Sequence, residues 1–78
     1  MQNRTDGDPY ENLANVIVSE AAKDYIAALK KLKRKHNNKI AMQEAMDLER
    51  FFHSGWYSML TSVDPDYLIR RLREEVSK

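Results

Sequence analysis

The stretch between Pro9 and Gly55 contains neither proline nor glycine, the two residues that most often interrupt a helix. It is rich in Ala, Leu, Lys, Glu, Met and Gln, all of which favour helix. Its apolar residues recur at steps of three and four, and no segment of the chain alternates with the period of two that marks a half-buried strand. We therefore predict an all-α fold, a compact bundle of three to four helices.

The first helix is expected to be long. Asp8 can accept hydrogen bonds from the free amides of the first turn, and Pro9 suits the first helical position. The helix is expected to end at residues 36–38, where an asparagine can adopt the left-handed conformation that closes many helices. Its apolar residues form one stripe that should be buried: Leu13, Val16, Ile17, Ala21, Tyr25, Ala28, Leu29 and Leu32.

Three further helices are predicted. The second covers residues 39–53 and, after so short a connection, runs antiparallel to the first. Ser54 is a suitable cap for a short third helix, while Asp64 and Pro65 repeat the start signal of the first helix and open a fourth that ends near Val76. The residues predicted to face the core are Ala41, Ala45, Leu48 and Phe52, flanked by Ile40 and Phe51, and then Leu68, Ile69, Leu72 and Val76.

The chain has 78 residues, enough for one domain with a single small core. We expect residues 1–8 to be a flexible leader and residues 9–78 to form that helical domain. A helix over residues 9–36 would be about 42 Å long, whereas a compact chain of this length is about 30 Å across. The first helix should therefore break, project its basic end, or be covered by another chain, of which a second copy is the simplest.

The composition excludes several classes of protein. No cysteine is present, which excludes disulfides and thiolate metal sites and favours a reducing compartment. No apolar run approaches the roughly 20 residues of a membrane span, and the polar start does not resemble a secretory signal. We expect a cytoplasmic protein that does not associate with membranes.

Several segments carry a likeness to a known family. They are residues 24–25, 28–30, 48–57, 60–61, 64 and 67–76. The chain resembles a functionally uncharacterised family of small helical proteins from prophages and mobile elements of Gram-positive bacteria. It departs from that family at Gly55, where an acidic residue is expected, and at Pro65, where a glycine is expected. The resemblance covers most of residues 12–76, implies a cytoplasmic and phage-linked protein, and supplies no catalytic residues.

The residues needed for catalysis or metal binding are sparse. The two histidines are His36 and His53, and Glu49 is the one acidic residue a helical turn from either, which gives too few ligands for zinc. Ser54 is adjacent to His53, but neighbouring residues on a helix point in different directions, and no glycine-rich loop is present to hold a phosphate. We predict no enzymatic activity, no catalytic, metal or cofactor-binding residues, and no small-molecule ligand.

Positive charge is concentrated in one segment. Residues 30–39 carry six Lys or Arg and no acid, although the formal net charge of the chain is only +1. A nucleic-acid phosphate backbone would be attracted to such a segment in a salt-sensitive way. The alternative is a solvated helix end, in which cations stabilise the negative end of the helix dipole. The candidate nucleic-acid contacts here are Lys30, Lys31, Lys33, Arg34 and Lys35.

Residues 57–73 fit a DNA-binding helix-turn-helix in part. A short helix, a turn with a buried Val63 and a capped helix would leave Arg70, Arg71 and Arg73 on an outer face, within reach of DNA. Two acids in the first turn of the capped helix, at the part that normally meets the bases, argue against this interpretation. The alternative is a surface helix with the ion pairs Arg70–Glu74 and Arg71–Glu75.

Aromatic residues are gathered in the second half of the chain. They are Phe51, Phe52, Trp56, Tyr57 and Tyr67, and most are expected in the core. Sequence neighbours such as Phe51 and Phe52 cannot all turn inward, so the remaining rings are expected to form a patch where a partner docks. The candidate docking residues are Phe51, Trp56 and Tyr57.

Two functions follow from these patterns. The first is a non-enzymatic interaction protein that docks on a protein partner or on a second copy of itself. The second is a small DNA-binding regulator that uses residues 57–73 together with the basic segment.

Overall fold

A computed structural model of the chain describes residues 9–78 and confirms the all-α prediction. Four helices follow one another, and no strand occurs within the described residues. Their bounds are α2 Pro9–Arg34, α3 Lys39–Phe52, α4 Gly55–Leu60 and α5 Pro65–Ser77. The predicted leader, with the predicted cap Asp8, lies outside the described residues.

Local capping explains where three of the helices begin. The side chain of Asn38 accepts a hydrogen bond from the amide of Ala41, that of Ser54 accepts from Tyr57, and that of Asp64 accepts from the second residue of α5. Ser54 and Asp64 are the predicted caps. The prediction of a left-handed asparagine after α2 is wrong: no described residue has a positive φ, and Asn38, with φ −72°, caps the start of α3 instead.

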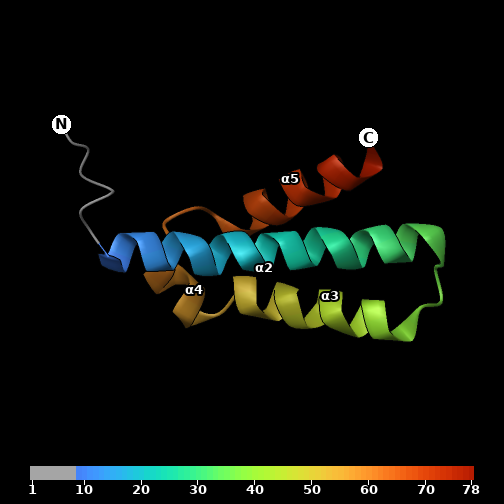
Figure 1. The fold of residues 1–78 in the computed structure, drawn as a ribbon, viewed down its shortest axis with the longest axis horizontal. Coiled ribbons are helices and arrows are strands. Elements are labelled where there is room, and N and C mark those ends of the chain that lie inside the picture. Colours follow the sequence, from blue (N-terminus) through green and yellow to red (C-terminus); the bar gives the residue numbers. More distant parts are fainter. Residues whose placement is uncertain (1–8) are drawn as a thin grey trace.

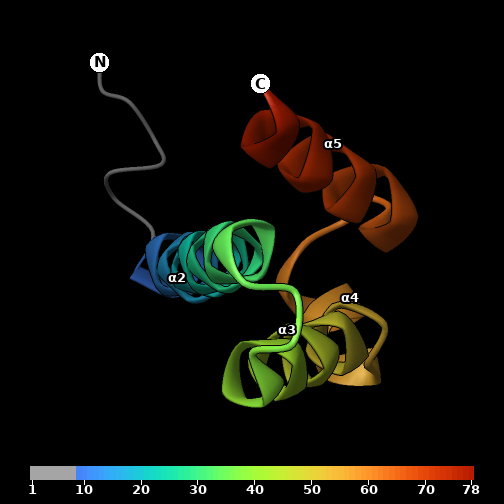
Figure 2. The same ribbon diagram turned by 90° about the vertical axis from the view of Figure 1, so that its right-hand side faces the viewer.

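All other helices are arranged around α2 (Figure 1). The antiparallel α3 packs along its C-terminal part, and α4 lies beside its N-terminal part. After α4 the chain passes to another side of α2, where α5 packs in the opposite direction to α3. Seen along α2, the helices α3 and α5 lie on different sides of it, and each packs mainly on α2 and not on the other (Figure 2).

The core lies where α2 faces its three neighbours, and aromatic rings fill its centre. Tyr25, Phe52 and Tyr57 are the largest fully buried side chains. The ring of Phe52 meets the edges or faces of the other two in T-shaped contacts, with centroids 5.6 Å from Tyr25 and 5.8 Å from Tyr57. The other buried residues are Ala21, Ala28, Ala41, Ala45 and Ile69, with Leu48, Leu68 and Leu72 partly buried against them.

The predicted buried stripe of α2 is wrong at its N-terminal end. Leu13 is 58% exposed and Val16 is 55% exposed, because at about 100° per residue they lie about 120° and 180° around the helix from the buried Tyr25. At about 39 Å for its 26 residues, α2 is far longer than α3, which measures about 21 Å. The helix neither breaks nor projects its basic end, because α3 begins beside that end (Figure 1). Ile40 was predicted to flank the core, but it is 75% exposed.

Candidate functional site

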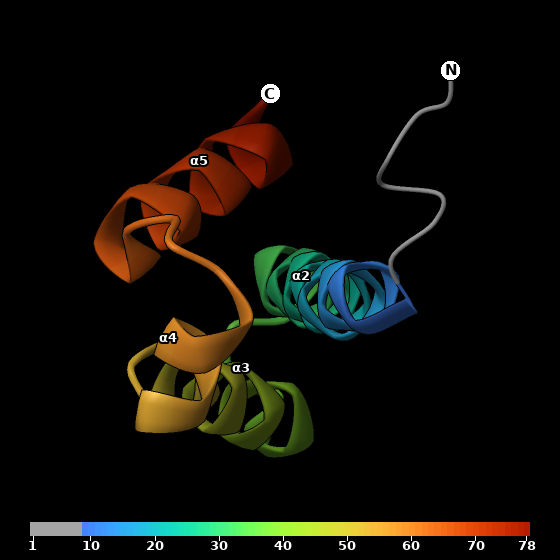
Figure 3. The ribbon, with the colours of Figure 1, turned by 90° about the vertical axis from the view of Figure 1, so that its left-hand side faces the viewer.

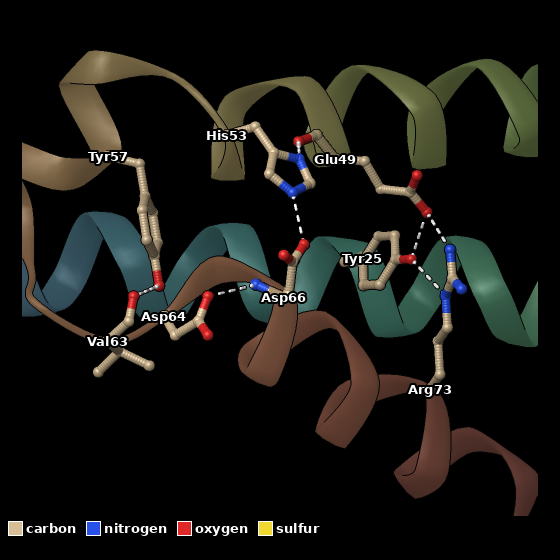
Figure 4. Close-up of polar contacts among 8 residues, drawn as sticks. All are labelled: Tyr25, Glu49, His53, Tyr57, Val63, Asp64, Asp66 and Arg73. Carbon is tan, nitrogen blue, oxygen red and sulfur yellow. Dashed lines mark hydrogen bonds and ion pairs between the residues drawn. The ribbon is translucent and has the colours of Figure 1, made fainter.

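A polar cluster joins three helices on the rim of the core (Figure 4). The hydroxyl of Tyr25 on α2 donates a hydrogen bond to the carboxylate of Glu49 on α3 and accepts one from Nε of Arg73 on α5, at 3.1 Å. A terminal nitrogen of Arg73 lies 2.8 Å from the same Glu49 oxygen. Tyr25 is fully buried and its hydroxyl group meets two partly exposed side chains, so this cluster links α5 to the other two helices at the edge of the core.

His53, just after α3, makes a second connection to α5. Its Nε2 lies 2.8 Å from Oδ1 of Asp66, and its Nδ1 lies 3.0 Å from the backbone oxygen of Glu49 (Figure 4). A protonated imidazole donates from both nitrogens, which matches two acceptors on opposite sides of the ring. We call the five residues Tyr25, Glu49, His53, Asp66 and Arg73 the polar clasp.

The environment of the clasp shifts the pKa values of its members. Burial, together with the hydrogen bond to Glu49, raises the pKa of Tyr25. Burial also raises the pKa of Glu49, but the hydrogen bonds from Tyr25 and Arg73 outweigh it and hold that pKa below its usual value. The hydrogen bond to Asp66, and then the contact with the Glu49 carbonyl, raise the pKa of His53. The phenol therefore stays protonated between a carboxylate and a guanidinium, an arrangement that joins helices.

The clasp predicts how stability depends on pH. Because the folded pKa of His53 is raised, its contribution is complete below the unfolded value of about 6.5 and is lost as the pH rises through the folded value. The urea midpoint of the protein should fall across that window, and His53→Gln should remove that fall. His36→Gln is the matched control, because His36 is exposed at the other end of α3 and should leave the pH profile unchanged. An unaltered profile in His53→Gln would contradict this role.

The structure places the three candidate arginines of α5 in different surroundings. Arg70 lies over the ring of Tyr67, 5.7 Å from its centroid, whereas Arg71 pairs with Glu74 at 3.5 Å. Arg73 belongs to the polar clasp. The predicted pairs Arg70–Glu74 and Arg71–Glu75 are wrong, because Glu74 is taken by Arg71 and Glu75 by Lys78, each at a spacing of three residues. The predicted burial of Val63 is also wrong: the residue is 44% exposed.

The basic residues lie at the turn between α2 and α3, and two of the five candidates have partners. Lys31 pairs with Glu44 at 3.7 Å, and Lys33 donates a hydrogen bond to the backbone oxygen of Val76 at 2.9 Å. The others are exposed and make no ion pair within the described residues. Lys39, the first residue of α3, is likewise exposed and makes no ion pair with any side chain that the structure describes. We call these four cations the basic tip: Lys30, Arg34, Lys35 and Lys39.

The three candidate docking residues differ in how far they are exposed. The prediction that Tyr57 is a docking residue is wrong, because Tyr57 is only 1% exposed and its hydroxyl group donates to the backbone oxygen of Val63 at 3.0 Å (Figure 4). Phe51 is half-buried and packs edge-on against Trp56, with centroids 5.6 Å apart. Trp56 itself is 57% exposed.

Several exposed apolar side chains belong to elements that lie at the end of the molecule opposite the basic tip (Figure 1). They come from the start of α2, from α4 and from the segment after α4, and Figure 3 looks at this end. We call them the apolar end: Leu13, Val16, Trp56, Met59 and Val63. Met59 is 84% exposed, the largest fraction among the exposed large hydrophobic residues.

The described residues offer little for other chemistry. Among the side chains that the structure describes, those of residues 12–78, no three or more His, Asp or Glu come together as a metal ion would need. None of the helices that the structure describes has the length and apolar character to cross a membrane. The depressions on this part of the chain are shallow and open, and the one beside the clasp is lined mainly by charged side chains.

Sequence reasoning missed the polar clasp. Its members are far apart in the chain, 24 residues from Tyr25 to Glu49 and 48 from Tyr25 to Arg73. One signal was present: a tyrosine on a buried stripe needs a partner for its hydroxyl group. Nothing in the spacing, however, indicates which carboxylate or arginine supplies it.

Comparisons with models of protein families, with curated proteins and with solved structures find no match to this chain.

Proposed function

We propose that this protein is a small non-enzymatic interaction module that pairs with a second copy of itself through the apolar end. A cytoplasmic location, favoured by the lack of cysteine, and a link to prophages or mobile elements, which rests on the sequence resemblance, are parts of the same proposal.

The observation that carries the proposal is the exposure of large apolar residues in a very short chain. A domain of this length has just enough apolar surface to offset the entropy of ordering its chain. Nine large hydrophobic residues nevertheless stay exposed in the part of the chain that the structure describes, and five of them belong to the apolar end. Pairing two such ends would remove this surface from water, and a two-fold dimer is the commonest way for identical chains to do so.

The position of the apolar end supports pairing of like with like. It lies where α2 extends past α3 and, among the described residues, has only α4 beside it, so a second copy can reach both helices without displacing a described neighbour (Figure 1). Trp56 is the type of residue that dominates binding energy at such interfaces. The patch is small, so we expect a weak dimer with a dissociation constant on the order of micromolar or higher.

The test is the mass of the protein in solution as a function of its concentration. Light scattering should return 9.2 kDa at low concentration and approach twice that mass at high concentration. Leu13→Glu/Met59→Glu should keep the protein monomeric, because it buries charge in the interface. Met42→Glu/Met46→Glu is the matched control: it adds the same charge at exposed methionines of α3, outside the apolar end, and should still dimerise.

Two outcomes would contradict the proposal. One is a wild-type protein that stays at 9.2 kDa over the whole concentration range. The other is a control variant that loses association to the same extent as the apolar-end variant, which would assign the interface to another surface.

The helix-turn-helix alternative has less support. In that motif the two helices pack on each other, whereas α5 packs mainly on α2. Arg71 and Arg73 are engaged by carboxylates of the chain itself, and Val63 does not fill the turn. Binding of a specific duplex that depends on Arg70 and Arg71 would restore this alternative.

A further inference from the structure

The positive charge of this protein is concentrated in one segment, at one end of the molecule. Residues 30–39 hold six of the 13 Lys and Arg and no acid, so the remainder of the chain sets seven cations against 12 acids and carries a net charge of −5. A formal net charge of +1 therefore hides a strongly positive end. The short connection between α2 and α3 brings both helix termini to that end (Figure 1).

Within this segment the structure separates engaged cations from available ones. Lys31 and Lys33 are directed to Glu44 and to the C-terminal turn of α5. The four cations of the basic tip are exposed and make no ion pair with the described side chains of residues 12–78, although acids are plentiful on the other surfaces. Two helices contribute to the tip, so its charges are held on a rigid hairpin.

The helix dipole explains only part of this cluster. Cations at the C-terminal end of α2 are favoured there, which accounts for Lys30, Arg34 and Lys35 as local stabilisation. Lys39 lies in the first turn of α3, where the dipole disfavours a cation, and no acid is present in that turn to balance it. Local helix stability therefore does not account for the tip as a whole.

We propose that the basic tip binds the phosphate backbone of double-stranded nucleic acid without reading its sequence. Exposed Lys and Arg neutralise phosphates and release the counterions condensed on them. Residues 30–39 contain no Phe, Tyr or Trp, and the single ring of His36 offers no platform on which successive single-stranded bases could stack, which favours a duplex. An anionic membrane fits less well, because Ile40 is the one exposed large apolar side chain that the described residues place beside the tip, and interfacial binding needs a continuous apolar face.

The salt dependence of binding gives the proposal a number. Each phosphate contact contributes about −0.9 to the slope of log K against log salt, so four contacts give a slope of about −3.6. The affinity for a random duplex of about 20 base pairs should fall about 150-fold between 50 and 200 mM salt. Fluorescence anisotropy with a labelled duplex measures both the affinity and the slope.

The matched variants remove equal charge from two places. The tip variant is Lys30→Gln, Arg34→Gln, Lys35→Gln and Lys39→Gln, and the control variant is Lys23→Gln, Arg50→Gln, Arg70→Gln and Arg71→Gln. Both lower the net charge by four, and far-ultraviolet circular dichroism shows whether each is folded. The tip variant should lose at least about 100-fold in affinity at 50 mM salt, whereas the control should change far less.

The outcomes separate this proposal from its competitors. No binding by the wild type at the micromolar concentrations typical of non-specific complexes, or an equal loss in both variants, would overturn it. Binding to phosphatidylserine vesicles but not to the duplex would assign the tip to membranes and would also overturn it. The Leu13→Glu/Met59→Glu variant, which tests self-association, should bind the duplex through each monomer with the same salt slope, so the two proposals can fail independently.

Discussion

Phe52→Ala should lower the free energy of unfolding by about 3–5 kcal/mol, the range found when a large buried ring is removed. Phe52 is fully buried at the C-terminal end of α3 and packs against both Tyr25 and Tyr57. It therefore couples three helices, and the cavity left by its ring cannot close without moving one of them. Urea unfolding followed by circular dichroism at 222 nm measures the loss.

The neighbouring ring supplies the control for this prediction. Phe51 is half-buried on the side of α3 that faces α4, so Phe51→Ala should cost clearly less. Because a protein this small has little stability to lose, Phe52→Leu serves as a second variant, with an expected loss of no more than about 1.5 kcal/mol. An equal loss of stability for Phe51→Ala and Phe52→Ala would contradict the difference in burial between the two rings.

Ile69→Ala should be the most damaging change within α5, with a loss of about 2–5 kcal/mol. Ile69 is the only buried residue of this helix, and the half-buried Leu68 and Leu72 flank its contact with the core. The polar clasp lies at the solvent-exposed rim, where ion pairs contribute little. The attachment of α5 to α2 therefore depends mainly on this side chain.

Tyr67→Ala is the control on the same helix. Tyr67 is 49% exposed and contacts Arg70, so its loss should cost less than about 1 kcal/mol. Hydrogen exchange adds a local measurement: in Ile69→Ala the amides of α5 should lose protection before those of α3. Near-wild-type stability of Ile69→Ala would show that α5 is held by something other than the core.

The order and bounds of the helices could be predicted because their signals are local. Ser54 and Asp64 act on amides within three residues, so their capping roles are visible in the sequence. Asn38 shows the limit of this reasoning. The same residue type can end one helix or begin the next, and the sequence does not show which. In the structure the side chain of Asn38 accepts from the amide of Ala41 and so begins α3.

Burial was less predictable than helix position. Periodicity identifies which side of α2 carries apolar residues, but it contains no information on how far a neighbouring helix extends. Steps of three and four assign Leu13 and Val16 to the stripe of Tyr25, but at about 100° per residue they lie about 120° and 180° around α2 from that ring and stay exposed. Their exposure is also the feature that supports pairing.

The polar contacts of α5 depend on long-range geometry. Arg73 was a candidate DNA contact because of its charge, whereas its partners Tyr25 and Glu49 come from two other helices. No periodic pattern relates these three positions, so only the packing of α5 across α2 brings them together. Three cations of the basic tip, Lys30, Arg34 and Lys35, were candidates from the sequence because they lie in one basic segment, but only the structure separates them from the engaged Lys31 and Lys33.

The single tryptophan offers the most direct test of pairing through the apolar end, because Trp56 lies within that surface. Quenching of its fluorescence by acrylamide should be measured from low to high protein concentration. If two apolar ends meet, the quenching constant should fall in step with the rise in mass, and Leu13→Glu/Met59→Glu should keep it high throughout. A quenching constant that stays high while the mass doubles would show that the copies associate elsewhere and would contradict the account.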